Sequence, residues 1–173
     1  MQEQLAGGGF SERVHEGINS NKELCLCDNR TLALLHVLLN NRELRRLVEQ
    51  VTGCGCIGSF QGRVYRVIPG QGHHDAWHND LGEQRLLALS LNLSAEPYQG
   101  GVLQIRERAS QRIVYEIANI GCGDAIVFRL DKKLQHRITE VEGVWHKTAF
   151  AGWFRAGPDY LATLRGASLF TGV

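Results

Sequence analysis

The segment Trp77–Leu93, WHNDLGEQRLLALSLNL, joins a short polar motif to a long strand-like run. The run Leu86–Leu93 is rich in leucine, and it predicts a buried β-strand. The polar motif is the tripeptide His78-Asn79-Asp80. Because side chains two residues apart in a strand point to the same side, we expect His78 and Asp80 to converge while Asn79 faces away.

Short apolar runs of this kind recur throughout the region that follows Gly53, where Gly, Pro, Asn and Asp separate them. Such runs predict β-strands, and the absence of long helical patterns between them argues against a parallel βαβ fold. Seven strands are expected, at Arg63–Ile68, Leu86–Leu93, Val102–Arg106, Ile113–Ala118, Asp124–Leu130, Gln135–Val141 and Thr148–Phe154, and Cys56–Phe60 is a further candidate.

Two helices are expected before these strands. The first is the leucine-rich segment Thr31–Leu39, and the second runs to Val51, ahead of a stop at Gly53. The candidate N-caps are Asp28 or Asn29 for the first helix and Asn40 or Asn41 for the second. The predicted apolar face of the second helix consists of Leu44, Leu47, Val48 and Val51.

Helices followed by many short strands predict a mainly β protein, either a sandwich or a barrel, with N-terminal helices packed on one outer face. A length of 173 residues suits a single compact domain. We expect residues 1–21, which are Gly-rich and polar, to form a flexible lead-in. Residues 22–53 would form a helical support and residues 54–173 the β core.

The bulk composition excludes some classes of function. The net charge is +1, from 19 Lys and Arg against 18 Asp and Glu, so no strongly basic surface for nucleic acid is expected. No run approaches the ~18 apolar residues of a membrane span, so a membrane partner is not expected either. Met1–Glu16 has no apolar stretch like that of a signal peptide, and a cytoplasmic location is the expectation.

The chain has five cysteines, of which Cys25 and Cys27 form one C-x-C pair and Cys54 and Cys56 another. Zinc sites usually have two to four residues between paired cysteines, so these pairs fit zinc poorly. A disulfide framework also fits poorly with the expected location. We therefore expect reduced, structural thiols, with a zinc site as the alternative.

The candidate chemistry centres on His78, Asp80 and the distant His136. Two imidazoles and one carboxylate are the ligand set of the facial triad that holds non-haem Fe(II) and leaves coordination positions open. Lys147 follows eleven residues after His136, and it could anchor a carboxylate-bearing molecule beside that metal. Together these residues predict an iron enzyme that uses O₂ and a dicarboxylate cosubstrate.

Two other motifs compete for these roles. A second H-x-D tripeptide, His73-His74-Asp75, lies close to the first, and His146 is an alternative distal histidine. We favour His78-Asn79-Asp80 because Trp77 precedes it and a strand follows it at a short distance. His146 directly precedes Lys147, and it would face the opposite side of the strand.

Six segments follow one another in a recognisable order between about Tyr65 and Phe154. They are VYRVIPG at 64–70, WHND at 77–80, RLLALSLNL at 85–93, YQGGVL at 98–103, HRITEV at 136–141 and KTAFAGWF at 147–154. In these segments the chain resembles the 2-oxoglutarate- and Fe(II)-dependent dioxygenases, in particular the prolyl-4-hydroxylase-like branch.

The resemblance implies a double-stranded β-helix, or jelly-roll, core with His78, Asp80 and His136 as iron ligands near one mouth. It also implies that Lys147 pairs with the C5 carboxylate of 2-oxoglutarate. Tyr65 is a weaker candidate for a hydroxyl contact to the same carboxylate, with core packing as the alternative. The implied cofactors are Fe(II), 2-oxoglutarate as cosubstrate and O₂, and ascorbate is a candidate stimulant.

The implied reaction is hydroxylation of an unactivated C–H bond, coupled to oxidative decarboxylation of 2-oxoglutarate to succinate and CO₂. Asp80 favours hydroxylation, because relatives that halogenate lack the carboxylate ligand. The expected substrate is an amino acid, a peptide or another small molecule. Two other functions stay open, namely a cupin-type metal enzyme that does not use 2-oxoglutarate and a non-catalytic jelly-roll binding module.

Loops usually select the substrate on such a scaffold. The segments His73–Trp77 and Arg106–Arg112 are candidates for a lid. Candidates for the rim of the substrate site are Arg66, Arg85, Arg106 and Trp77, with ordinary surface or packing positions as the alternative.

Overall fold

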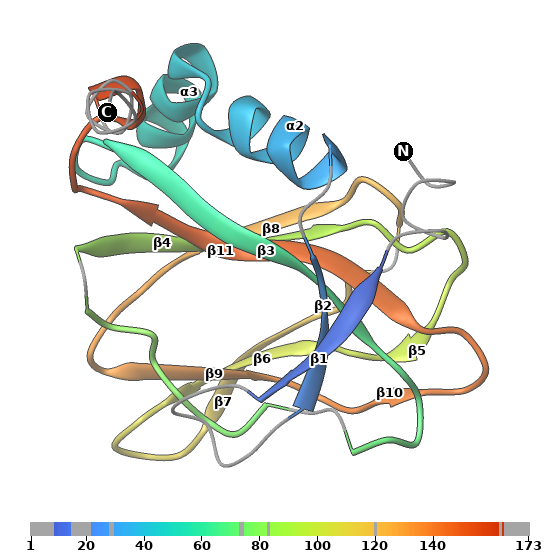
Figure 1. Cartoon of the computed structure of the whole chain (residues 1–173). Helices are drawn as coiled ribbons and strands as arrows, with labels where there is room; N and C mark the ends of the chain where they lie inside the picture. The colour runs from blue at the N-terminus through green and yellow to red at the C-terminus, as the bar shows by residue number, and fades with distance from the viewer. Residues whose placement is uncertain are drawn as a thin grey trace.

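Two β-sheets face each other, and helices cover the outer side of the larger sheet (Figure 1). This computed structural model describes residues 9–14, 22–27, 30–72, 75–82, 84–119, 121–162 and 164. The mainly β architecture with helices on one face is the one that the sequence predicted. None of the helices in the described part of the chain is long and apolar enough to cross a membrane.

The larger sheet has six antiparallel strands in the order β1-β2-β3-β11-β4-β8. They span Phe10–Val14 (β1), Lys22–Leu26 (β2), Ser59–Val67 (β3), Lys147–Arg155 (β11), Arg85–Asn92 (β4) and Ala125–Arg129 (β8). The longest pairing joins β3 and β11, from Lys147 opposite Val67 to Arg155 opposite Ser59. It places Lys147 and Tyr65 on neighbouring strands at one end of the sheet.

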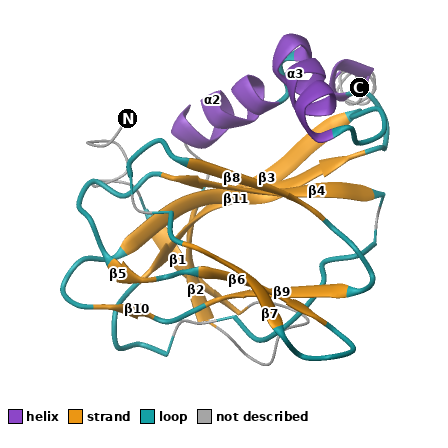
Figure 2. Ribbon diagram, turned by 180° about the vertical axis from the view of Figure 1, so that it is seen from behind, coloured by secondary structure: helices purple, strands orange, loops and turns teal. Residues whose placement is uncertain are grey.

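The smaller sheet has the order β7-β6-β9, and Figure 2 shows it below the larger sheet. Its strands are β6 (Leu103–Glu107), β7 (Ile113–Ile117) and β9 (Leu134–Ile138). A two-stranded ribbon of β5 (Gln99–Gly100) and β10 (Val141–Glu142) lies at its end. The functional residues discussed below come from both sheets.

Helices α2 (Arg30–Leu39) and α3 (Arg42–Thr52) are present as predicted. Asn41 is the N-cap of α3, because its Oδ1 accepts hydrogen bonds from the backbone N–H groups of Glu43 and Leu44. Gly53 ends the helix in the left-handed conformation, with φ 61°. The candidate caps of α2, Asp28 and Asn29, lie outside the described residues.

The main core lies between the helices and the larger sheet. Phe60, Phe150 and Phe154 form edge-to-face pairs with centroids 4.9 and 5.4 Å apart, and none is more than 1% exposed. Asn40 ties the end of α2 to this core, because its amide exchanges two hydrogen bonds with the backbone of Phe60, at 2.7 and 3.0 Å. The larger sheet is thereby held rigidly from its outer side.

All seven predicted strands are present, with shifted ends. The predicted Gln135–Val141 divides into β9 and β10, and the candidate Cys56–Phe60 contributes its last two residues to the start of β3. The sequence did not predict the two strands that the structure has before residue 30. Strand β1 lies within the expected lead-in and β2 within the expected helical support, and β2 pairs with β3 at Cys25 opposite Tyr65.

The predicted apolar face of α3 is wrong at two of its four positions. Leu47 and Val51 are 54% and 77% exposed, whereas Arg45 is buried. The guanidinium of Arg45 donates to the carbonyl oxygen of Ile57 at 2.9 Å and to the carboxylate of Asp159 at 3.0 Å. Because these acceptors satisfy its charge, an arginine can occupy an inward position of the helix.

All five cysteines are free thiols. Cys25 is buried in β2, and burial raises the pKa of its thiol to about 11. Within the described ranges no cysteine belongs to a cluster of side chains that could hold a metal. The zinc alternative therefore finds no site there.

Candidate active site

His78, Asp80 and His136 bring their side chains together between the two sheets. In the part of the chain that the structure describes, they form the one group of His, Cys, Asp or Glu residues with all ligand atoms within 4.8 Å. Oδ2 of Asp80 lies 3.5 Å from Nε2 of His78 and 3.2 Å from Nε2 of His136. Residues 56 positions apart in the chain thus offer two nitrogens and one oxygen to a common point.

The backbone anchors His78 to the smaller sheet. The N–H of His78 donates to the carbonyl of His136 at 3.1 Å, and the N–H of His136 donates back at 2.8 Å. This isolated antiparallel bridge pairs His78 with the middle residue of β9. The two imidazole rings lie side by side as a result, with centroids 4.3 Å apart.

The carboxylate of Asp80 reaches the two imidazoles by a route that differs from the predicted one. Asp80 is not part of a strand; it has φ 54°, in the left-handed region that few residues other than Gly, Asn and Asp adopt. Oδ1 of Asn79 accepts a hydrogen bond from the N–H of Leu81 at 3.2 Å, which stabilises the turn. A sharp turn, not strand alternation, therefore directs the carboxylate.

The tautomer of His78 suits a metal ligand. Its Nδ1 lies 2.7 Å from the carbonyl oxygen of Ala76, and a carbonyl can only accept a hydrogen bond. Nδ1 must therefore carry the proton, and in the neutral ring Nε2 presents its lone pair toward Asp80 and His136.

Two side chains of the larger sheet hold Asp80. Nε1 of Trp153 donates to Oδ2 at 3.0 Å, and Nη1 of Arg85 lies 3.7 Å from Oδ1. Burial opposes ionisation of Asp80, but hydrogen bonds from His136 and from the protonated form of His78 outweigh it, and the pKa of the carboxyl falls well below its usual range. The carboxylate is therefore ionised at neutral pH. Trp153 was not among the predicted site residues, although it shares the strand face of Lys147.

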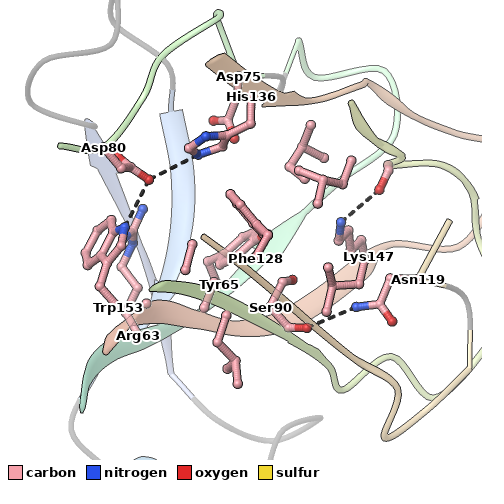
Figure 3. A pocket seen from close by; sticks show the side chains of 18 of the residues that line it. Arg63, Tyr65, Asp75, Asp80, Ser90, Asn119, Phe128, His136, Lys147 and Trp153 are labelled. Atoms are coloured by element: carbon pink, nitrogen blue, oxygen red, sulfur yellow. Dashed lines mark hydrogen bonds and ion pairs between the residues drawn. The ribbon is translucent and has the colours of Figure 1, made fainter. Parts of the chain in front are cut away.

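The cluster opens into a pocket between the sheets, with a volume of about 100 Å³ (Figure 3). That volume holds several water molecules, since one needs roughly 10–15 Å³ on this measure. Asp80 and Lys147 lie on opposite sides of the pocket. The apolar lining comes from both sheets and includes Leu89, Leu103, Ile126, Phe128 and Ile138.

Lys147 is buried, with 1% of its surface exposed, and is not the solvated edge residue that a strand end usually carries. Its Nζ donates one hydrogen bond, to the carbonyl of Gly101 at 2.9 Å, and lies 5.6 Å from the centre of the Tyr98 ring. Burial lowers the pKa of its ammonium to about 8, although the charge of Asp75 opposes the shift.

Tyr65 lies on β3 and lines the same pocket. It also packs against the small apolar cluster of Val67, Tyr98 and Val141, so both roles considered for it are compatible with its position. Burial raises the pKa of its phenol, and its hydroxyl stays protonated as a donor for an acceptor in the pocket.

The competing motifs are placed differently. Asp75 lines the pocket without joining the three-residue cluster, and His73 and His74 lie outside the described residues. His146 stands outside the cluster, and burial lowers its pKa. Arg106–Arg112 spans the last two residues of β6 and the β6–β7 connection, and none of its residues lines the pocket.

Of the four predicted rim residues, only Arg85 contacts the cluster. Arg66 stacks on Phe10 of β1 at 4.0 Å. Trp77 contacts the guanidinium groups of both Arg106 and Arg137, which lie 4.2 and 4.6 Å from its ring centre. Trp77 therefore holds the loop that carries His78 against the smaller sheet, and it is not among the residues that line the pocket.

Several solved structures share this fold. A 2OG-Fe(II) oxygenase family oxidoreductase from Burkholderia pseudomallei superposes with a TM-score of 0.65 at 12% identity, covering 89% of this chain and 76% of that one. A prolyl-4-hydroxylase from Pseudomonas putida gives 0.61 at 19% identity, covering 89% and 81%. A prolyl hydroxylase from Trichoplax adhaerens, solved with a hypoxia inducible factor peptide fragment, gives 0.54 at 15% identity, covering 98% and 78%.

These likenesses establish the fold, the jelly roll that the sequence predicted. No curated protein matches the chain. The family model of the 2OG-Fe(II) oxygenase superfamily matches residues 60–155, more than half of the chain. That range contains all three clustered residues and Lys147. The superfamily implies Fe(II), 2-oxoglutarate and O₂ as cofactors, and the expectation of an enzyme is confirmed: the chain belongs to the 2OG-Fe(II) oxygenase superfamily.

Proposed function

We propose that this oxygenase is a dioxygenase that hydroxylates an unactivated C–H bond of an amino acid, a peptide or another small molecule. One observation carries the proposal. A cluster of two histidines and one aspartate shares a pocket with a buried lysine on the opposite wall. The first group suits Fe(II), and the second suits the far end of a dicarboxylate.

Fe(II) would be held by Nε2 of His78, Nε2 of His136 and the carboxylate of Asp80. The donor set fits the facial triad, which leaves three positions of an octahedron open. The protonation states also fit, because the proton on Nδ1 of His78 leaves Nε2 for the metal in the neutral ring, and because Asp80 is ionised. Trp153 and Arg85 would orient the carboxylate from outside the metal shell.

2-Oxoglutarate would bind with its C5 carboxylate on Lys147. An ammonium group has three donors, and one hydrogen bond of Nζ is present among the described residues, to Gly101. A buried cation with unused donors requires an anionic partner. The hydroxyl of Tyr65 is a second donor for that carboxylate, from the neighbouring strand.

When bound, iron and 2-oxoglutarate supply oxidative decarboxylation to succinate and CO₂ and the transfer of one oxygen atom of O₂ to a C–H bond. The residues of the chain position both and keep water out. Phe128, Ile126 and Ile138 present apolar surface around the site. Asp80 fills the coordination position that halogenating relatives leave for chloride, which favours hydroxylation.

The proposal is tested by succinate formation from 2-oxoglutarate with Fe(II), ascorbate and O₂. The wild type is compared with His136→Ala, and His146→Ala is the matched control because it lies outside the cluster. We expect turnover in the wild type and the control and none in His136→Ala, and ascorbate should increase the yield.

Some enzymes of this chemistry turn over slowly without substrate, so binding is measured as well. Fe(II) and then 2-oxoglutarate are titrated into the protein without O₂. Failure of 2-oxoglutarate to bind the Fe(II)-loaded protein would contradict the proposal and favour the cupin-type enzyme. Failure of the metal to bind would favour the non-catalytic module.

A further inference from the structure

We propose that Asp75 binds a cationic group of the substrate, so that this enzyme selects a substrate with an amine or another positively charged group near the oxidised carbon. The inference rests on the proposed function and names the substrate class of the same site. It starts from a pocket-lining carboxylate that neither the metal cluster nor the lysine anchor uses.

An irregularity in the backbone directs Asp75 into the pocket. His78 pairs with His136, so a regular antiparallel ladder would place Ala76 opposite Ile138. Instead, the N–H of Asp75 donates to the carbonyl of Ile138 at 3.3 Å. The segment 75–78 therefore contains one extra residue, a β-bulge, and Asp75 and His78 both line the pocket although they are three residues apart.

Trp77, within the bulge, anchors the segment as well, because its ring contacts the guanidinium groups of Arg106 and Arg137. In Figure 3, Asp75 and His136 overlap at one end of the view, with Lys147 further along, and the backbone N–H of Asp75 is bonded to Ile138, two residues after His136 in β9. The backbone of Asp75 is thus anchored to β9, the strand that carries His136, and its side chain lines the same pocket as the metal cluster.

Charge balance leaves Asp75 as the group that requires a partner. The described lining contains three carboxylates and two cations, which are Glu23, Asp75, Asp80, Arg63 and Lys147. Arg63 forms a two-point ion pair with Glu23, at 2.7 and 3.0 Å. In the proposed holoenzyme Asp80 binds the metal and Lys147 binds 2-oxoglutarate.

No hydrogen bond or ion pair to the carboxylate of Asp75 is present among the described residues. The negative charge of Asp75 nevertheless acts inside the pocket. It raises the pKa of Tyr65, and it also raises the pKa of Lys147, which burial lowers. In the proposed holoenzyme the two charges of Fe(II) are balanced by Asp80 and one carboxylate of 2-oxoglutarate, and Lys147 is balanced by the other carboxylate. The negative charge of Asp75 then remains in the pocket lining. A cationic substrate would neutralise that charge, and an anionic one would be repelled.

The test uses two probes of equal shape, tert-butylammonium and tert-butanol, with the full chain loaded with Mn(II) and 2-oxoglutarate. Mn(II) replaces Fe(II) because it is paramagnetic and supports no turnover. The relaxation rate of the methyl protons of each probe reports how often that probe lies near the metal. Asp75→Asn removes the charge at constant shape, and Asp131→Asn is the control at an exposed position.

We expect the ammonium probe to relax at least about threefold faster than the alcohol in the wild type and in Asp131→Asn, in line with a partly exposed ion pair. In Asp75→Asn the two probes should relax equally. Equal relaxation in the wild type, or an unchanged preference in Asp75→Asn, would overturn the proposal. Water proton relaxation reports the binding of Mn(II) and 2-oxoglutarate, so failure at that earlier step identifies the proposed function as the part that is wrong.

Discussion

Nε1 of Trp153 lies 3.0 Å from Oδ2 of Asp80, and this hydrogen bond joins the centre of the larger sheet to the proposed metal site. The guanidinium of Arg85 stacks on the same indole ring, 3.7 Å from its centre, and also reaches the carboxylate. Asp80 itself belongs to a turn with left-handed backbone. Strands β4 and β11 therefore hold the carboxylate of this turn, through Arg85 and Trp153.

Trp153→Phe should weaken metal binding while the fold persists. The ring still fills its place, but the donor to Asp80 is lost, and loss of such an outer partner typically costs about 10- to 100-fold in metal affinity. Anaerobic Fe(II) titration measures the effect. Trp145→Phe is the matched control, because Trp145 is 50% exposed. An unchanged affinity in Trp153→Phe would show that the carboxylate needs no support from the sheet.

Lys147→Met should stabilise the protein in the absence of 2-oxoglutarate and abolish tight binding of that molecule. Burial lowers the pKa of Lys147 to about 8, so keeping its charge inside the fold costs free energy at pH 7. Removing the charge should raise the free energy of unfolding by roughly 1–3 kcal/mol. Urea denaturation measures this gain, and calorimetry measures the affinity for 2-oxoglutarate, expected to fall at least about 30-fold.

The affinity for 2-oxoglutarate should decrease as the pH rises above about 8, because the free protein then loses the proton of Lys147. The expected decrease approaches tenfold per pH unit. The free energy of unfolding should show the opposite trend. The unfolded chain, with an ordinary lysine pKa, binds more protons between pH 8 and 10.5 than the folded protein does, so the contribution of Lys147 to stability rises with pH there. Lys147→Met should remove the stability trend, and a pH-independent affinity in the wild type would contradict the assigned anchor.

Gly101→Ala should lower both stability and the affinity for 2-oxoglutarate. Gly101 has φ 59°, and a Cβ there would lie 2.9 Å from the Tyr98 ring and 3.2 Å from Cδ of Lys147. Gly123→Ala is the matched control, since Gly123 has φ 91° with nothing within 4 Å of the added carbon. Both variants carry backbone strain, of order 1–3 kcal/mol, but only the first should displace the lysine. Equal affinities of the two variants for 2-oxoglutarate would show that the lysine tolerates the displacement.

The sequence predicted the strands of the core because their apolar runs and Gly or Pro breaks are local signals. It predicted the members of the metal cluster by residue type and order. It failed for β1 and β2, whose sequences FSERV and KELCL mix charged and apolar residues. Their pairing is specified by distant partners such as Tyr65 and not by local pattern.

The orientations within the site were beyond sequence reasoning for a related reason. Strand alternation correctly predicted that the side chains of His78 and Asp80 converge. The predicted cause was wrong, because a turn with a positive φ at Asp80, and not a strand, directs the carboxylate. The hydrogen bond from Trp153 and the inward position of Arg45 depend on acceptors far away in the chain. Such contacts exist only after folding and leave no periodic signal.

The bulge between Asp75 and His78 has a consequence for how such an enzyme diversifies. The two proposed roles, selecting a substrate and holding a metal, belong to one short segment, and each residue has its own backbone anchor on β9. A codon change at position 75 can therefore alter the charge offered to substrates while the ligand at position 78 keeps its pairing with His136. Deleting one of the two residues between them would remove the bulge and leave the two positions two residues apart, which is the spacing of side chains on one face of a strand. The segment can therefore shorten by one residue and still present both side chains to the pocket.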